Sequence, residues 1–290
     1  MLNPAFVTVI LVRYSEIGLK SPGIRKRFEN QLRDNMLGML MEDGVEAFVQ
    51  SKGARYYVSA SDPDAAVASL RKVFGIASVS IAEECGSSME EMCARAAEYS
   101  RGRISKGETF AVRARREGNQ GYTSMDVGRE VGSAIFIANE DLGVDVSLSD
   151  PDREFFVEVR DDKAHLFSES IPCHGGLPVG TQGRVVAHVN DERGMVSAWL
   201  MMKRGCRASV IGDYGFECLK QYDPLMRQVD REPKNALAYV MGTSLEGLEG
   251  VDVSKYQLPV FFPTIGMSDD EVSALAETIR AGLRDKFRHN

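Results

Sequence analysis

The chain has 290 residues, enough for two or three domains, and its 43% hydrophobic and 27% charged residues are ordinary for a globular protein. A formal net charge of -7 argues against a protein that binds nucleic acid over its whole surface, and no apolar stretch is long enough to predict a membrane-spanning helix. The five cysteines include no C-x-x-C pair, which disfavours a disulfide framework or a zinc finger. We therefore expect a cytoplasmic protein with free thiols and no metal site.

The first part of the chain, residues 1–83, predicts a ferredoxin-like domain. The expected elements are a strand over 5–14, a helix from Pro22 to Gly44, strands near 45–50 and 55–60, a helix opened by Asp62-Pro63, and a strand near 77–83. The order β-α-β-β-α-β in about eighty residues is typical of two helices packed on one antiparallel sheet.

Residues 84–171 predict a second unit that mixes helices and strands. The expected elements are a helix over roughly 88–103, a strand over 108–115, a helix from about Ser124 to Asn139, and strands near 144–148, 154–160 and 164–168. Ser124 is a candidate cap of the second helix. Val127, Val131 and Ile135 lie at helical spacing and predict its buried face.

Residues 172–290 predict a third domain, which follows a loop rich in glycine and proline from Pro172 to Gly183. The expected elements are strands at 184–189, 207–211, 236–241 and 258–262, alternating with helices at 195–204, near 222–230 and at 269–286. This alternation predicts a parallel sheet with a ligand site beyond the carboxyl ends of its strands. Trp199, Leu200 and Met201 are expected in its core.

Basic residues are concentrated in two places, between Arg13 and Arg33 and between Arg101 and Arg116. Arg113 and Arg115 lie two positions apart on the predicted strand 108–115, so both side chains should project from the same face. Two adjacent guanidiniums could hold a phosphate group between them. The alternative is a pair of surface arginines bound to nearby carboxylates, and the pattern alone leaves both possibilities open.

Several stretches resemble the tRNA sulfurtransferases that make 4-thiouridine. "VRYSEIGLKSPGIRKRFENQL" is similar to their N-terminal signature, and "FAVRARR", "YTSMDVGREVG" and "PDREFFVEVRDDKAHLF" are similar to their THUMP domain. "GGLPVGTQGRVV" and "SAWLMMKRG" resemble the entrance of their PP-loop ATP pyrophosphatase domain, and "NALAYVMGTSLEGL" and "LPVFFPTIGMSDDEVSALAETI" resemble later parts of it. The resemblance implies a ferredoxin-like domain and a THUMP domain that bind tRNA at its acceptor end, followed by a Rossmann-like α/β domain that uses ATP.

The sequence departs from this family at the nucleotide loop. The family motif Ser-Gly-Gly-x-Asp-Ser-Pro aligns with Val189 to Met195, and the former loop residues here are Asn190, Asp191, Glu192, Arg193 and Gly194. Backbone amides at a helix N-terminus bind phosphate, whereas carboxylates repel it. The chain also has no cysteine after Cys218, although the resemblance implies a sulfur-carrying cysteine further along.

These observations predict a tRNA-binding protein without catalytic residues or cofactors. The expected phosphate contacts are Lys20, Arg25, Lys26, Arg27, Arg113, Arg115 and Arg116. A separate sulfur-transfer enzyme and a second copy of the chain are further expected partners. One alternative is an active sulfurtransferase, acting in tRNA modification or thiamine synthesis, that takes ATP and Mg²⁺ at an unconventional site and uses Cys173, Cys206 or Cys218. Another is an interaction module of sulfur metabolism with no RNA role.

Overall fold

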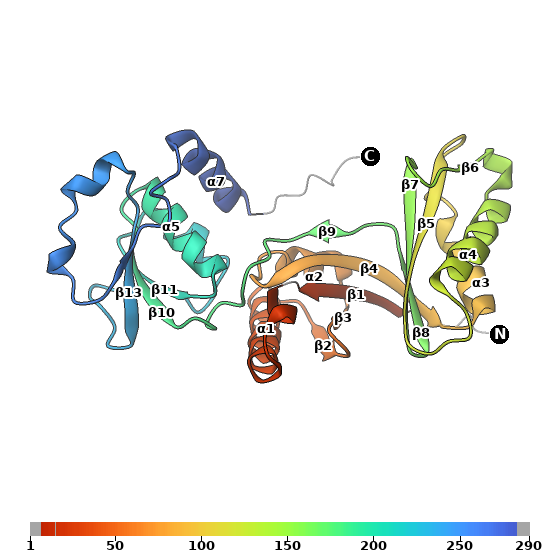
Figure 1. Ribbon diagram of the computed structural model, residues 1–290, viewed down its shortest axis with the longest axis horizontal. Helices are drawn as coiled ribbons and strands as arrows, with labels where there is room; N and C mark the ends of the chain where they lie inside the picture. Colours follow the sequence, from red (N-terminus) through yellow and green to blue (C-terminus); the bar gives the residue numbers. More distant parts are fainter. Residues whose placement is uncertain (1–6, 15, 283–290) are drawn as a thin grey trace. The chain divides into compact units, whose positions relative to one another are not determined.

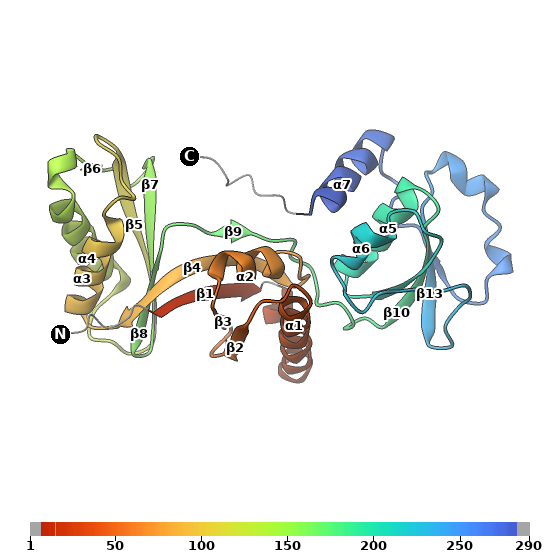
Figure 2. The same cartoon turned by 180° about the vertical axis from the view of Figure 1, so that it is seen from behind.

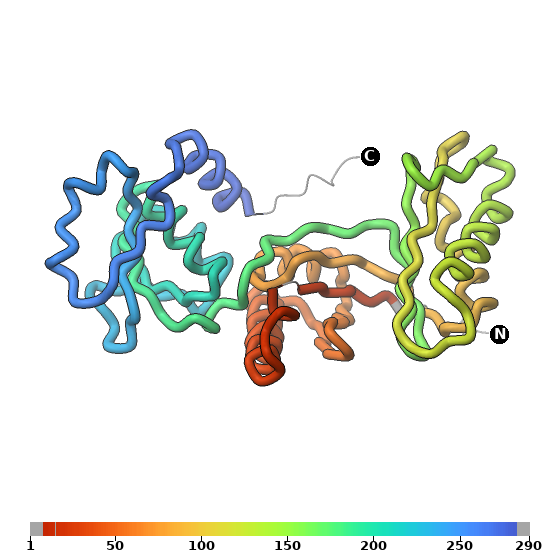
Figure 3. Tube along the Cα trace, viewed as in Figure 1, coloured from red at the N-terminus to blue at the C-terminus, as the bar shows by residue number. Residues whose placement is uncertain are grey.

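The computed structural model describes residues 7–14 and 16–282. Contacts divide the chain into two compact units (Figures 1 and 3). Of the described residues, one unit comprises 7–11, Tyr57–Ser59 and Ser80–Ile171. The other comprises 12–14, 16–56, Ala60–Val79 and 172–282. Within the described ranges, no helix has the length and apolar character needed to cross a membrane.

The N-terminal elements confirm the ferredoxin-like prediction. They are β1 (Val7–Tyr14), η1 (Glu16–Leu19), α1 (Pro22–Glu42), β2 (Ala47–Ser51), β3 (Tyr56–Ala60), α2 (Pro63–Leu70) and β4 (Ile76–Gly86). The strands adjoin in the order β2-β3-β1-β4. Phe28, Leu32 and Met36 lie at helical spacing on α1 and are buried. Positions 5 and 6 of the predicted first strand lie outside the described residues.

The second group of elements also follows the predicted order. It consists of α3 (Met89–Ser100), β5 (Thr109–Glu117), α4 (Ser124–Ala138), η2 (Glu140–Leu142), β6 (Asp145–Val146), β7 (Arg153–Arg160), β8 (Lys163–Phe167) and β9 (Ile171–Pro172). The predicted cap Ser124 is wrong by one residue. Thr123 caps α4 instead, in a capping box with Asp126 that satisfies two backbone amides at once.

The C-terminal elements form a parallel sheet with helices, as predicted. They are β10 (Arg184–His188), α5 (Glu192–Lys203), β11 (Arg207–Ile211), α6 (Phe216–Lys220), β12 (Arg227–Gln228), β13 (Ala236–Met241), η3 (Glu246–Gly250), η4 (Val253–Lys255), β14 (Val260–Phe261) and α7 (Asp269–Ala281). The strand order is β12-β11-β10-β13-β14, and all the pairings are parallel. Figure 2 shows α5, α6 and α7 gathered beside this sheet.

Two predictions for this domain were wrong in detail, and a third lies outside the described residues. A helix near 222–230 does not form, because Arg227 and Gln228 pair with β11 as strand β12 and the Asp223 carboxylate accepts a hydrogen bond from the Leu225 amide. Helix α5 begins at Glu192 rather than at residue 195. The predicted end of the last helix, at 286, lies outside the described residues.

An aromatic cluster joins the ferredoxin-like elements to the α/β domain within the second unit. Phe74 follows α2, His174 lies in the glycine-rich loop, and Trp199 and Tyr222 belong to the α/β domain. The His174 ring lies 5.7 Å from Phe74, 5.2 Å from Trp199 and 5.3 Å from Tyr222, measured between centroids. Trp199 is buried as predicted, whereas Leu200 and Met201 are only partly buried, which corrects their assignment to the core.

Candidate functional site

The former nucleotide loop lies where the sequence placed it, at the carboxyl end of the central strand. Strand β10 pairs with β11 on one side and β13 on the other, and the loop runs from its end into α5. In parallel α/β sheets this junction is the usual position of a ligand site. The strand–loop–helix geometry of a phosphate site is therefore present. What this site can bind depends on the side chains of the loop.

Asp191 occupies the position from which a helix N-terminus holds an anion. Its backbone is extended, and its Oδ1 accepts a hydrogen bond from the Gly194 amide at 2.7 Å. That amide is one of the donors at the start of α5 that would otherwise be free for a phosphate oxygen. The protein's own carboxylate thus takes the place of a bound anion.

Glu192, in the first turn of α5, is held by α7. Its Oε2 accepts a hydrogen bond from Arg280 Nη2 at 2.5 Å, and its Oε1 accepts one from Ser273 Oγ at 2.8 Å. The Arg280 guanidinium, followed by the Ser273 hydroxyl, holds the pKa of the Glu192 carboxyl below its usual range. Glu192 is therefore ionised at neutral pH and serves to attach α7 to the start of α5.

The Arg193 side chain also makes hydrogen bonds within the protein. Its Nη1 donates to the carbonyl oxygens of Thr264 and Met267 at 2.9 and 3.1 Å, and its Nη2 contacts Asp269 Oδ1 at 2.6 Å. The guanidinium is turned toward the segment that leads into α7. These three hydrogen bonds fix the direction of the guanidinium.

Glycines bring the neighbouring strand ends against the loop. A Cβ atom on Gly242, just after β13, would lie 2.3 Å from the Gly194 nitrogen and 2.4 Å from the Arg193 carbonyl carbon. A Cβ atom on Gly212, just after β11, would lie 2.4 Å from the Val189 oxygen, and its φ of +101° favours glycine. The loop backbone is consequently packed on both sides.

Some basic side chains of the ferredoxin-like domain are exposed, and one is bound in an ion pair. Lys20, Lys26 and Arg27 are exposed near the start of α1. Arg25 is half-buried and forms an ion pair with Glu29, with 2.8 Å between its Nε and Oε1. Lys20, Lys26 and Arg27 can contact a polyanion without breaking any ion pair that the structure describes.

Strand β5 presents Arg113 and Arg115 on one face, as the sequence predicted. Val112 and Ala114 pack against the core beneath α3 and α4, which cover that face of the sheet (Figure 1). Arg113 and Arg115 therefore project from the opposite face, because side chains alternate along a strand. This part of the site could be inferred from residue spacing alone.

The partners of these arginines could not be inferred in the same way. Arg113 Nε lies 2.7 Å from Glu154 Oε1, and β7 brings that glutamate alongside β5. Arg116 Nη1 donates to Gln120 Oε1 at 3.1 Å, whereas Arg115 is exposed. Of the two possibilities for Arg113, the structure shows a surface arginine bound to a nearby carboxylate.

Comparisons with known proteins show which proteins the chain resembles. Residues 9–80 match the model of the ThiI ferredoxin-like domain, and residues 86–169 match the model of the THUMP domain. The chain is 38% identical over 201 residues to a probable tRNA sulfurtransferase of Methanosarcina mazei and 39% identical over 201 residues to that of Methanosarcina acetivorans.

The chain is a relative of the tRNA sulfurtransferases.

The match covers 68% of this chain but 49% and 48% of those two relatives, so the chain aligns with about half of their length. Among solved structures, it superposes on PH1313 from Pyrococcus horikoshii with a TM-score of 0.80 at 26% identity, covering 94% of this chain and 99% of that one. A 4-thiouridine synthetase–RNA complex with bound ATP has the same fold, with a TM-score of 0.77 at 23% identity, covering 94% of this chain and 85% of that one.

The candidate sulfur-carrying cysteines of this tRNA sulfurtransferase relative are poorly suited to that role. Burial raises the pKa of the Cys173 thiol to about 12 and also raises the pKa of Cys206. A thiol must ionise to act as a nucleophile, so a raised pKa disfavours the reactive form of both groups. Cys218 lies in α6 and packs against the core of the α/β domain.

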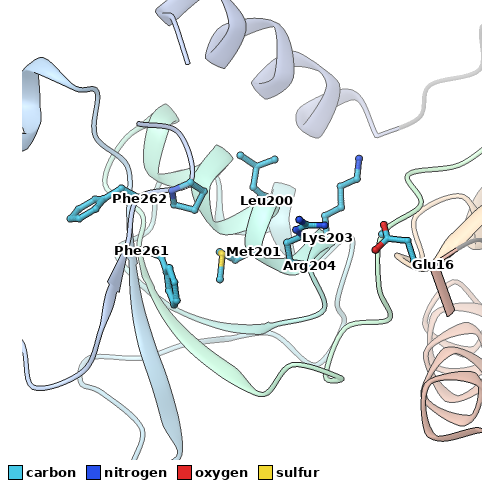
Figure 4. Close-up of a pocket in the computed structure, with 9 residues that line it drawn as sticks. Glu16, Leu200, Met201, Lys203, Arg204, Phe261 and Phe262 are labelled. Atoms are coloured by element: carbon cyan, nitrogen blue, oxygen red, sulfur yellow. The ribbon is translucent and has the colours of Figure 1, made fainter. Parts of the chain in front are cut away.

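Sequence reasoning missed one feature of this domain, a cavity of about 470 Å³ beside the C-terminal half of α5. Figure 4 shows side chains of α5, β14 and η1 around it. The sequence predicts Leu200 and Met201 as core residues. Both are partly exposed because they line this cavity. The sequence does contain one indication of this cavity. Lys203 and Arg204 are two cations that follow apolar residues at the end of a helix, a pattern typical of an amphipathic surface.

Proposed function

We propose that this chain binds tRNA through its ferredoxin-like and THUMP domains and carries out no ATP-dependent chemistry at Asn190–Gly194. Support for RNA binding comes from the curated relatives, which are named as probable tRNA sulfurtransferases, and from the THUMP match. A separate enzyme would then supply any sulfur transfer, either by docking on this chain or by acting on the tRNA that it holds.

The exposed basic side chains make the main contacts in this proposal. Lys20, Lys26, Arg27 and Arg115 can neutralise phosphates directly. The other three predicted contacts, Arg25, Arg113 and Arg116, already have partners, so their contribution is smaller or requires an exchange of partners. Phosphate contacts position a nucleic acid without reading its bases, so recognition depends mainly on tRNA shape.

The loss of ATP chemistry rests on one observation, the internal pairing of the charged loop residues. Asp191 takes the Gly194 amide, Glu192 binds Arg280, and Arg193 binds Asp269. A polyphosphate would have to displace the capping carboxylate and remain next to a second one. Each unfavourable charge pair at about 4 Å costs on the order of 1 to 4 kcal/mol in a partly hydrated site.

Filter binding of tRNA at increasing salt tests the first half of the proposal. We expect the affinity to fall steeply with salt. The combined substitution Lys26→Ala, Arg27→Ala and Arg115→Ala should reduce the slope of log K against log salt by about 1 for each side chain that binds a phosphate. Arg231→Ala, which removes an exposed arginine of the α/β domain, is the matched control. Absence of binding at low salt, or equal binding by the triple variant, would contradict the proposal.

Release of pyrophosphate from ATP tests the second half. With Mg²⁺ and tRNA present, we expect no release above that of a protein-free blank. Protein-dependent release would show that the loop, or another site on the chain, still activates ATP. That result would favour the alternative of an active sulfurtransferase, whatever the outcome of the tRNA titration.

A further inference from the structure

The cavity beside α5 lies far from the former nucleotide loop. The loop is at the N-terminus of the helix, whereas the cavity is lined by Leu200, Met201 and Lys203 near its end and by Arg204, which follows it. At 1.5 Å per residue, the twelve residues of α5 separate its two ends by about 18 Å. A ligand in the cavity would therefore occupy a different place from the phosphate site that the family frame implies.

The cavity has the size and composition of a small-molecule site. Its volume of about 470 Å³ lies within the range of ligand pockets, which are mostly apolar with a few polar groups. Its apolar wall is made by Leu200, Met201, Phe261 and Phe262. Phe261 is 48% exposed, so part of a phenylalanine ring is available for contact with a planar group.

The charged groups lie apart from the apolar ones. In Figure 4, Lys203, Arg204 and Glu16 lie on the side away from the two phenylalanines. Arg204 is exposed, and within residues 7–14 and 16–282 no carboxylate pairs with it. Lys203 Nζ lies 5.5 Å from the centroid of the Trp199 ring, a cation–π contact that fixes the direction of its side chain.

The backbone around the cavity is held in place before any ligand binds. The Leu177 amide donates to the Lys203 carbonyl oxygen at 2.9 Å, so this carbonyl at the helix C-terminus is already satisfied. Gly176 lines the cavity with a φ of +78°, and a Cβ atom there would lie 2.2 Å from the same oxygen. The glycine-rich loop is thus pressed against the end of α5, which makes the cavity a preformed feature.

We propose that this cavity binds a 5′-mononucleotide, either free or as an exposed unit of a single-stranded RNA. The base contacts Phe261 and Met201, and the phosphate contacts Arg204 and Lys203. Arginine suits this role because its planar guanidinium can bind phosphate oxygens bidentately. The Glu16 carboxylate can accept a hydrogen bond from a ribose hydroxyl, as acidic residues do in other nucleotide sites.

The inference goes beyond the proposed function, because it concerns the α/β domain and does not depend on the basic residues of the other two domains. Isothermal titration of the full chain with AMP, UMP and a short single-stranded oligoribonucleotide tests it. We expect saturable binding of one equivalent of mononucleotide below about 1 mM. The chain has a single tryptophan, Trp199, and its fluorescence should change with the same midpoint because Lys203 lies over its ring.

Arg204→Ala should weaken binding by about 10-fold or more, because the variant cannot make a hydrogen bond to the charged phosphate. Arg204→Lys should bind with intermediate affinity, since the charge remains without the bidentate geometry. Arg227→Ala, which removes another exposed arginine of the same domain, is the control and should bind as the unaltered chain does.

The three ligands separate the two sources of the nucleotide. Binding of AMP or UMP identifies a site for free mononucleotides, whereas binding of the oligoribonucleotide alone, with the same sensitivity to Arg204→Ala, identifies a site for RNA. Failure of all three ligands to bind would overturn the proposal. So would binding that is unchanged in Arg204→Ala or weakened equally in Arg227→Ala.

Discussion

Asp191 illustrates how one carboxylate alters the chemistry of a helix N-terminus. A glycine at this position would leave the amide of Gly194 free for an anion, whereas the aspartate satisfies it at 2.7 Å. The same side chain caps α5 and, in the function that we propose, keeps phosphate away from its start. That its charge opposes phosphate stays a prediction from the sequence, which did not identify Asp191 as the cap.

Replacing this cap should lower stability in a way that depends on hydrogen bonding rather than on charge. We expect Asp191→Ala to reduce the free energy of unfolding by about 1 kcal/mol. Asp191→Asn should cost little, because asparagine caps helices equally well. Urea denaturation of both variants measures the difference, and an equal loss in the two would show that the charge matters instead.

The junction between β13 and α5 depends on close backbone packing. Gly242 touches the first turn of α5 so closely that a methyl group there would meet the backbone of Arg193 and Gly194 at 2.3 to 2.4 Å. Neighbouring backbone cannot move aside as a flexible side chain can. The end of β13 and the start of α5 should therefore respond together to any added volume.

Gly242→Ala tests this packing against a glycine in open space. We expect it to lower the free energy of unfolding by about 1 to 3 kcal/mol, the usual cost of overpacking. Gly250→Ala is the control, because nothing lies within 4 Å of a Cβ atom there and its φ is not in the left-handed region. If thermal melts of the two variants coincide, the packing described at the junction is wrong.

The sequence predicted most elements, because their signals are local. The buried residues of α1 and α4 lie at helical spacing, and the faces of β5 follow from alternation. Contacts between distant residues were not predictable. The pairing of Arg113 with Glu154 depends on the register of β5 with β7, and that of Glu192 with Arg280 depends on where α7 packs. The spacing of residues along the chain reveals neither the strand register nor the packing of α7.

At the scale of the whole molecule, the aromatic cluster around His174 attaches the ferredoxin-like elements to the α/β domain. Burial, with smaller effects of the nearby Lys203 and Arg71 charges, lowers the pKa of His174 to about 4. The imidazole is therefore neutral at physiological pH and packs as an aromatic ring between Phe74, Trp199 and Tyr222. Protonating it would place a charge inside the cluster.

This predicts a loss of stability in mild acid. Between the ordinary histidine pKa of about 6.5 and the folded value of about 4, the unfolded chain binds more protons at His174 than the folded chain does. Stability therefore falls as the pH is lowered through this window.

His174→Phe isolates the contribution of this histidine, since it keeps a ring but cannot be protonated. We expect the urea midpoint of the variant to fall less than that of the unaltered chain between pH 7 and pH 5. Parallel declines in the two proteins would assign the acid sensitivity to other groups.

The α/β sheet has a further property that follows from the strands at its two margins. Both β12 and β14 are only two residues long, Arg227–Gln228 and Val260–Phe261. Short outer strands offer few free peptide groups to another molecule, and this is one way in which proteins avoid edge-to-edge aggregation. We therefore expect any self-association of the chain to use side-chain surfaces rather than the extension of this sheet from one copy into the next.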